Sequence, residues 1–457
     1  MKEPHLYKSK EAWVYAIHIS LGMFNNAYCF TELNSSIENV KSTLNWEDDS
    51  IYVPIVNSIV MLGYFISNFA ILGYSDRYGR RGSMILEHSL VIVGSVLSII
   101  PYTSTIIIGR ALKGLGAGGF FTICAPYINE ISPDALAGKL GSLVCVSCVF
   151  GLACSTGLSL FLPSQNYSTD PLNNLWMFNL GFPGIVSIYC LYYFLFVQKL
   201  DSPGWYLSNN QKPEAIKALS IIYTAEGIQS GLDRFKLKNT EPLLRPKEKT
   251  GYFSFIFQRR NRKMMRLAVL LTLFKQFTGI NVVLAYSTTI FKEVSGDEFN
   301  SRLISFAITV INIFSSLFGL VLLDWFGRKT LILIGQGGLG LLLILFALFS
   351  FFEVGITSLA ICMFLYIFIA SPTIGSAYWA FLSETENDIG ISLVCVTNTL
   401  VTFVFMFVFE WSIEAFTIVG VFAALAVGSF VGVWYIRWDV FETKGKRKAE
   451  IEDCLYE

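Results

Sequence analysis

Runs of about twenty apolar residues recur along this chain of 457 residues, and they constrain its fold more than any other feature. A helix needs about 20 predominantly apolar residues to cross the ~30 Å hydrocarbon core of a bilayer. Such runs lie at 12–33, 51–73, 83–101, 106–128, 139–162, 175–197, 264–292, 301–322, 330–351, 357–381, 391–412 and 414–437. Only 15% of the residues are charged, whereas a typical soluble domain has about 25%. The sequence therefore predicts an all-α membrane protein with twelve transmembrane helices.

The distribution of Lys and Arg sets the predicted orientation, because cytoplasmic loops carry an excess of these residues. With both termini in the cytoplasm, the short inner loops hold Arg77, Arg80, Arg81, Lys139, Arg328 and Lys329. Two N-x-S sequons, at Asn34 and Asn166, fall in loops assigned to the outside, and they predict glycosylation. Sequons suggest passage through a secretory pathway, so we expect the plasma membrane rather than an internal organelle.

A polar segment interrupts the apolar pattern at 198–263 and divides the spans into six and six. We therefore predict an N-terminal six-helix bundle at 1–197 and a second six-helix bundle, with a cytoplasmic tail, at 264–457. Residues 198–263 are expected to form a cytoplasmic linker with short helices.

The two predicted bundles carry corresponding motifs after corresponding spans. These are DRYGRR at 76–81 and DWFGRK at 324–329, then Glu130 and Glu384, then Asp201 and Glu442. Three pairs of corresponding motifs, in the same order along both halves, indicate a duplicated, pseudo-symmetric fold. In such folds the substrate site lies where the two repeats meet, near the middle of the membrane.

The motifs resemble those of the sugar porter family of the major facilitator superfamily, which includes the facilitative glucose transporters. They are GYSDRYGRR at 73–81, PYINEISP at 126–133, DSPGWYL at 201–207, QFTGIN at 276–281, DWFGRK at 324–329 and ETKG at 442–445. The resemblance covers nearly the whole chain. It implies transport of a hexose or related polyol by alternating access, by a protein that works as a monomer in the lipid bilayer and uses no cofactor.

Charged residues at the cytoplasmic ends of the helices are the candidate inner gate. In the family such groups form ion pairs that close this gate, and the resemblance assigns the role to Asp76, Arg80, Arg81, Glu130, Asp324, Arg328, Lys329 and Glu384. The alternative is a set of solvated charges that fix the topology, but acidic residues contribute little to the positive-inside rule. Arg110 lies within the fourth span, where a charge is functional or structural by default. Tyr286 stands at an outer-gate position.

A sugar site needs neutral amides, which donate and accept hydrogen bonds, and an aromatic surface for the apolar face of the ring. The resemblance carries over Gln276, Asn281, Asn312 and Trp379 as such residues. For the amides the alternative is helix–helix hydrogen bonding, and for Trp379 it is the interfacial aromatic belt. Gly279 lies between Gln276 and Asn281, so we expect a discontinuous helix there.

Several positions depart from the family pattern. Where the family has a sugar-contacting glutamine, an acid and two arginines, this chain has Cys145, Ser371, Ala137 and Ile391. The first span carries Asn25 and Asn26 but lacks the aspartate typical of proton-coupled sugar porters, which favours facilitative uniport. Glu32, the only acid near that position, is expected close to the outer surface.

Lys275 stands where the seventh-span motif of the family has a glutamine. It could contact the substrate, exchange a proton in a coupling mechanism, or pair for structural reasons, in that order of preference. Lys113, one turn beyond Arg110, is a second unusual cation. Cations facing one cavity would favour an acidic or phosphorylated solute. A carrier of an organic anion or modified sugar, with or without proton coupling, is therefore the alternative function.

Other function classes find less support. A non-transporting sugar sensor is a further alternative, but sensors often carry long tails, and the segments beyond the first and last spans are short. A net charge of zero gives no reason to expect a nucleic-acid partner. The sequence shows neither a nucleophile–base pair nor a metal-ligand cluster, so we predict neither an enzyme nor a metal site.

Overall fold

Helices make up nearly all of the computed structural model, which describes residues 6–47, 50–164, 171–240, 259–385, 388–446 and 450–451. Within these ranges the β-structure consists of an isolated bridge between Tyr7 and Tyr223. That bridge, together with a hydrogen bond from Lys8 Nζ to the carbonyl oxygen of Ser220, ties the start of the first helix to the central segment.

The first half of the chain consists of long helices with short connections. They are α1 (Ser9–Thr31), α2 (Ile37–Leu44), α3 (Tyr52–Ser98), α4 (Thr103–Gly118), α5 (Phe120–Ile131), α6 (Ala137–Leu158) and α7 (Leu175–Tyr192). α3 comprises two helices that meet at Gly79, whose φ of 86° breaks the helical path. L-residues with a side chain rarely adopt this conformation, so a glycine is needed at the corner.

The central segment and the second half continue the helical pattern. The short helices are α8 (Pro203–Ser208), α9 (Lys212–Ile222) and α10 (Ile228–Thr240). The second half contains α12 (Arg259–Phe277), α13 (Ile280–Ser295), α14 (Glu298–Trp325), α15 (Arg328–Phe351), α16 (Ile356–Ala370), the π-helical η4 (Ser371–Ala377), α17 (Tyr378–Thr385) and α18 (Asp388–Asp439). α18 also comprises two helices, which meet at Thr417.

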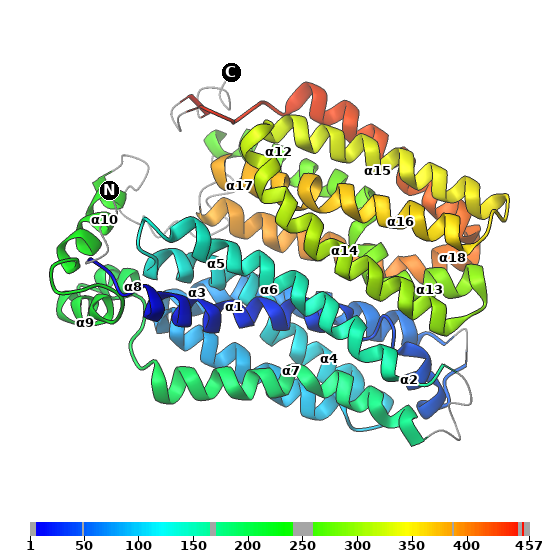
Figure 1. Ribbon diagram of the computed structural model, residues 1–457, viewed down its shortest axis with the longest axis horizontal. Coiled ribbons are helices and arrows are strands. Elements are labelled where there is room, and N and C mark those ends of the chain that lie inside the picture. Colours follow the sequence, from blue (N-terminus) through cyan, green and yellow to red (C-terminus); the bar gives the residue numbers. More distant parts are fainter. Residues whose placement is uncertain are drawn as a thin grey trace.

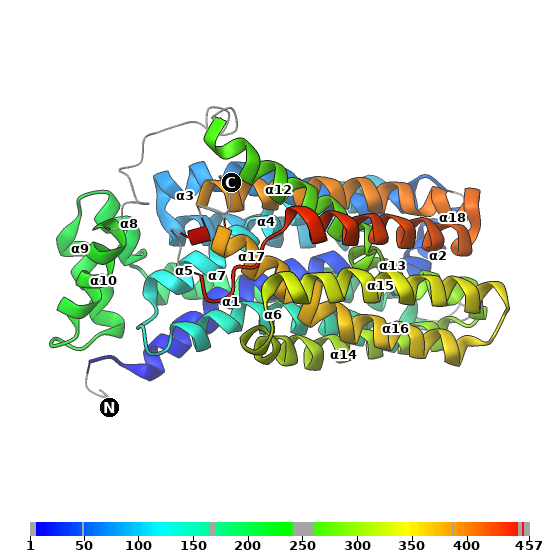
Figure 2. The same cartoon turned by 90° about the horizontal axis from the view of Figure 1, so that it is seen from above.

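Figure 1 shows the two halves lying along one another, with α1 and α3 to α7 in its lower part and α12 to α18 in its upper part. The halves pack through α3 against α18 and through α6 against α14. In both views α8, α9 and α10 lie beyond one end of the long helices (Figures 1 and 2). We call this the linker end, and the opposite end, where α2 lies, the distal end.

The helices agree with the predicted spans. Within the described residues, nine are long and apolar enough to cross a membrane, and they coincide with nine of the twelve predicted runs. The other three runs coincide with α1, with the part of α3 after Gly79, and with a shorter apolar helix at Leu393–Phe409. α1 is less apolar because it carries polar residues such as His18, Asn25 and Asn26, which are buried inside the bundle.

Small residues let α3 and α4 approach closely. A Cβ atom on Gly114 would lie 2.5 Å from the carbonyl oxygen of Val60, and one on Gly118 would lie 2.5 Å from Cα of Tyr64. Because these neighbours are backbone atoms, larger residues would force the two helices apart. Close packing through small residues is a common means of helix association in membranes.

Two helices of the second half are interrupted. Gly279, with a φ of 79°, separates α12 from α13, as expected from the sequence. The predicted tenth span changes to π-helix at Ser371, where Pro372 cannot donate a backbone hydrogen bond, and becomes α-helical again at Tyr378. π-helical turns of this kind are frequent at functional sites.

Candidate functional site

A network of amide groups surrounds the break between α12 and α13. Gln276 Nε2 donates to Thr402 Oγ1 at 2.6 Å and to Asn398 Oδ1 at 3.1 Å. Asn281 Nδ2 donates to Gln276 Oε1 at 2.9 Å. The broken helix thus presents two of the predicted site residues together against α18.

Lys275 enters the same network. Its side chain is only 7% exposed, and its Nζ donates to Asn398 Oδ1 at 3.2 Å. Nζ also lies 4.8 Å from the ring centroid of Tyr378 and 5.3 Å from that of Trp379, which follow directly after η4. Ring faces attract cations through their quadrupoles. The two rings and the amide oxygen are therefore the groups that stabilise this charge.

Trp379 and Asn312 extend the site in two directions. The Trp379 ring packs edge to face against Phe121 of α5, with centroids 4.9 Å apart, and so joins the second half to the first. Asn312 Oδ1 accepts hydrogen bonds from Ser371 Oγ of η4 and from Ser316 Oγ of its own helix. The structure thus brings Lys275, Gln276, Asn281 and Trp379 together and connects Asn312 to them through η4.

Asn398 and Thr402 belong to the network but were not predicted from the sequence. Asn398 makes the contact with Lys275. Its Oδ1 accepts from both Lys275 Nζ and Gln276 Nε2, so it lies at the centre of the network. The available signal was the polar triplet Thr397-Asn398-Thr399, which interrupts the apolar run at 391–412.

A second buried charge cluster lies in the first half. Glu32, the residue directly after α1, is 1% exposed, and its Oε1 accepts from Arg110 Nη1 at 2.7 Å and from Lys113 Nζ. Lys113 also donates to the carbonyl oxygen of Leu180 at 3.1 Å. Lys113 therefore binds an acid inside the first half and does not line a common site with Lys275.

The charges at the linker end form one matching set in each half. Arg80 Nη2 lies 3.3 Å from Glu130 Oε1, and Arg328 Nη2 lies 2.8 Å from Glu384 Oε1. Each of these two pairs is internal to one half. In the described parts of the chain, the predicted gate pairs thus join helices within a half and do not bridge the two halves.

Two carboxylates cap the turns that hold these arginines. Asp201 accepts from the backbone N–H groups of Arg80 at 2.8 Å and Arg81 at 3.0 Å. Glu442 accepts from the backbone N–H of Arg328 at 2.7 Å. The same arrangement in both halves agrees with the duplication inferred from the motifs.

The remaining predicted gate residues make separate contacts. Arg81 Nε donates to the carbonyl oxygen of Phe194, and Lys329 Nζ to that of Arg437. The backbone carbonyl of Asp76 accepts from Trp205 Nε1 at 3.0 Å. The side chain of Asp324 lies outside the part that the structure describes.

At the distal end, by contrast, side chains bind the two halves to each other. Asn34 Nδ2 donates to Ser287 Oγ at 2.8 Å, and Lys292 Nζ lies 2.8 Å from Glu38 Oε2. Arg302 Nη2 donates to Asn39 Oδ1 at 2.6 Å. We call the residues that form these cross-half contacts the distal lock: Asn34, Ser35, Glu38, Asn39, Ser287, Thr288, Lys292 and Arg302.

Tyr286 packs within its own half at this end. Its hydroxyl donates to the carbonyl oxygen of Met406 at 3.1 Å, and its ring lies 4.8 Å from that of Phe409. The next residues along α13, Ser287 and Thr288, bond to the first half. The gate position predicted from the sequence is thus adjacent to the residues that make the contact.

Asn34, a predicted glycosylation site, is one of the residues that make these contacts. The side chain is 4% exposed, and its Nδ2 donates to Ser287 Oγ and to the carbonyl oxygen of Leu284. A glycan attached to this nitrogen would displace both bonds in the conformation described here. Asn166 lies outside the described residues.

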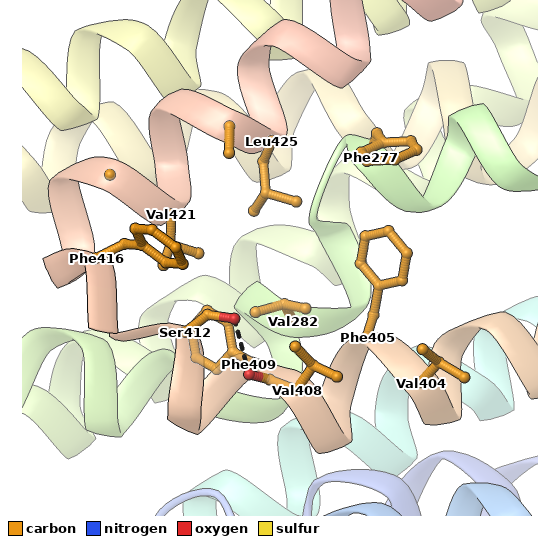
Figure 3. Close-up of a pocket in the computed structure, with 12 residues that line it drawn as sticks. Phe277, Val282, Val404, Phe405, Val408, Phe409, Ser412, Phe416, Val421 and Leu425 are labelled. Carbon is orange, nitrogen blue, oxygen red and sulfur yellow. Dashed lines mark hydrogen bonds between the residues drawn. The ribbon is translucent and has the colours of Figure 1, made fainter. Parts of the chain in front are cut away.

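An apolar pocket of about 390 Å³ lies beside the amide network, between α13 and the two parts of α18 (Figure 3). Phe277, Val282, Phe405 and Leu425 are among the side chains that line it. The one polar side chain in its lining, Ser412, donates its hydroxyl to the carbonyl oxygen of Val408 on its own helix. This pocket does not offer the hydrogen bonds that a polyhydroxylated solute requires, whereas the amide network does.

Comparison with known proteins gives consistent results. A family model described as "Sugar (and other) transporter" matches residues 12–455. A D-xylose transporter from Levilactobacillus brevis is 25% identical over 412 residues, which cover 88% of this chain and 86% of that protein. A glucose transport protein from Synechocystis sp. is 25% identical over 458 residues, covering 93% and 94%.

The fold is shared with solved structures. The partially occluded inward open conformation of the xylose transporter XylE from E. coli has a TM-score of 0.79 at 20% identity, and the match covers 95% of this chain and 99% of that one. XylE is described as a proton:xylose symporter of the major facilitator superfamily. The chain therefore has the twelve-helix fold of that superfamily.

Proposed function

The chain belongs to the sugar transporter family, and on this premise we propose that it carries a hexose, or a related sugar or polyol, across a membrane by alternating access. The observation that carries the proposal is the amide network of Gln276, Asn281 and Asn398 at the break in a helix. Amides both donate and accept, as sugar hydroxyls do, so they can exchange their mutual bonds for bonds to the solute. Trp379 supplies an aromatic surface that reaches the other half.

Facilitative uniport is the proposed mode. The first span lacks the aspartate that is typical of proton-coupled sugar porters, and its polar pair is neutral. Asn25 Nδ2 donates to Ser187 Oγ, and Asn26 Nδ2 donates to the carbonyl oxygen of Ala117. The acid further along this segment, Glu32, is engaged by two cations. Named relatives include an arabinose-proton symporter from Bacillus subtilis, so the coupling mode has to be measured in this protein.

The distal lock supports a proposal about the conformational cycle. The bundles at 1–197 and 264–457 would rock about the central site, with the lock closed in the state described here. The Arg80–Glu130 and Arg328–Glu384 pairs would contribute to closing the linker end in the opposite state. By the positive-inside rule, the linker end and both termini face the cytoplasm. We further propose that the protein works as a monomer in the plasma membrane.

Exchange across reconstituted liposomes tests both parts of the proposal. Vesicles loaded with unlabelled glucose should take up labelled glucose with equal pH on both sides. The variant Gln276→Ala should exchange more slowly, because it loses a donor and an acceptor of the network. A strict requirement for a proton gradient would contradict uniport but leave sugar transport intact. Failure to exchange glucose, xylose or a polyol under any gradient would contradict the proposed function as a whole.

A further inference from the structure

Lys275 is the exception among the buried cations of this protein. Within the described residues, four cationic side chains are buried: Arg110, Lys113, Lys275 and Arg302. Arg110 and Lys113 bind Glu32, and Arg302 binds Glu298. For Lys275, no described carboxylate lies within ion-pair distance, and its contacts are the neutral Asn398 and two aromatic rings.

This unbalanced charge lies within the proposed sugar site. Asn398 Oδ1 is shared between Lys275 Nζ and Gln276 Nε2, so a solute that binds the amides also lies next to the ammonium group. A charge inside the membrane is costly unless it is compensated, and such residues usually mark substrate or ion pathways. Because no described carboxylate compensates the Lys275 charge, an anionic group on the transported molecule would be a favourable partner for it.

We propose that the preferred solute is a sugar acid, which means a hexose-like molecule that carries one carboxylate. The carboxylate binds Lys275 Nζ, and the hydroxyls bind Gln276, Asn281 and Asn398. The inference rests on the proposed function and narrows its substrate class. An ammonium group has three donors, of which Asn398 takes one, so two remain for the carboxylate.

The charge balance selects a carboxylate over a phosphate ester. A phosphate monoester carries about −1.5 to −2 charges at neutral pH, which one lysine does not balance. The two other intramembrane cations that the sequence suggested, Arg110 and Lys113, are held by Glu32 in the first half. The rings of Tyr378 and Trp379 also hold Nζ in place, so the ammonium group is positioned before the solute arrives.

Ligand-induced thermal shifts of the full-length purified protein test this proposal, at constant ionic strength, with glucuronate, glucose and glucose 6-phosphate as probes. A ligand that binds the folded state raises its stability according to concentration and affinity, so titration gives an apparent Kd. We expect the wild-type protein to bind glucuronate about tenfold more tightly than glucose, as a charge-assisted bond should allow. Glucose 6-phosphate should bind more weakly than glucuronate.

Two variants sharpen the test. Lys275→Gln should weaken glucuronate binding about tenfold while glucose binding stays equal or improves, because a neutral donor and acceptor replaces the charge. Lys139→Gln, which removes an exposed cation from the first turn of α6, should leave both affinities unchanged. If Lys275→Gln does not fold, the proposal is tested by whether the wild-type protein binds glucuronate more tightly than glucose.

The outcomes distinguish a failure of the sugar-acid proposal from a failure of the proposed function. Glucose binding that equals or exceeds glucuronate binding in the wild-type protein would overturn the sugar-acid proposal and leave the proposed function in place. Tighter binding of glucose 6-phosphate than of glucuronate would overturn the choice of a carboxylate. Absence of binding by all three probes, in protein that unfolds cooperatively, would contradict the proposed sugar site itself.

Discussion

Lys292 Nζ of α13 lies 2.8 Å from Glu38 Oε2 of α2, and this ion pair joins the two halves at the distal end. The side chains are 35% and 21% exposed. Partly exposed pairs contribute only ~0–1 kcal/mol, because water and salt screen them. A weak contact suits a gate that has to open in every transport cycle.

Replacing Lys292 by glutamine should therefore open the distal end somewhat more often. A loss of up to ~1 kcal/mol corresponds to a change of up to about fivefold in the open population. A cysteine introduced at Ser287, which is 1% exposed within the lock, can report this opening. Its labelling by an impermeant thiol reagent should accelerate by that factor in Lys292→Gln and should not change in Lys139→Gln. Equal rates in all three proteins would contradict a gating role for the pair.

Arg302 should contribute more to the lock than Lys292 because it is fully buried. Arg302→Gln leaves Glu298 without its partner on the next turn, and removing one member of a buried pair costs about 3–5 kcal/mol. We expect a clearly lower unfolding temperature. The double variant Glu298→Gln/Arg302→Gln should recover part of the loss, because it also removes the buried carboxylate that has lost its partner Arg302. If the double variant is less stable than Arg302→Gln, the ion pair is not the source of the effect.

Glu32→Gln is expected to destabilise the first half strongly. It leaves Arg110 and Lys113 as two adjacent buried cations, and the cost of breaking a buried pair is about 3–5 kcal/mol. Adding Lys113→Met restores the original net charge of the cluster and should recover stability, as measured by thermal unfolding. In the combined variant, glucose exchange without a pH gradient should persist. Loss of that exchange in stably folded protein would assign the cluster a role in transport.

Asn398→Ala should weaken glucose binding without unfolding the protein. The amide accepts from Lys275 and Gln276, and a hydrogen bond to such a group contributes about 0.5–1.5 kcal/mol, or roughly two- to tenfold in Kd. Thr397→Ala is the matched control, because Thr397 Oγ1 donates to the carbonyl oxygen of Leu393 on its own helix. Apparent Kd values from thermal-shift titration should separate the two variants. The same Kd for glucose in both variants would contradict a role for Asn398 in the binding site.

The sequence predicted those features that depend on residues close together in the chain. The run of apolar spans predicted the helices, and Gly279 between two amides predicted the break in the seventh span. The contacts that it did not predict join distant positions. Asn398 lies 122 residues from Gln276, and a single sequence does not show which faces of two helices meet.

The same limit applies to the partners of Glu32 and Asn34, which the sequence does not identify. A sequon is a three-residue pattern, but the hydrogen bond that Asn34 makes is to Ser287, 253 residues later. Glu32 follows an apolar span, and Arg110 and Lys113, 78 and 81 residues later, supply the charges that allow it to be buried. Polar residues in apolar spans indicate that a partner exists, but only the fold identifies it.

The capping carboxylates at the linker end have a consequence for how the chain is made. Asp201 caps a turn that lies 121 residues earlier, and Glu442 caps one that lies 114 residues earlier. Chains leave the ribosome from the N-terminus, and domains generally fold as units during synthesis. In each half, the carboxylate that caps the turn at Arg80 or Arg328 is therefore synthesised only after the sixth helix of that half. A nascent chain stopped just before Asp201 would contain all the helices of the first half but lack the group that completes their assembly.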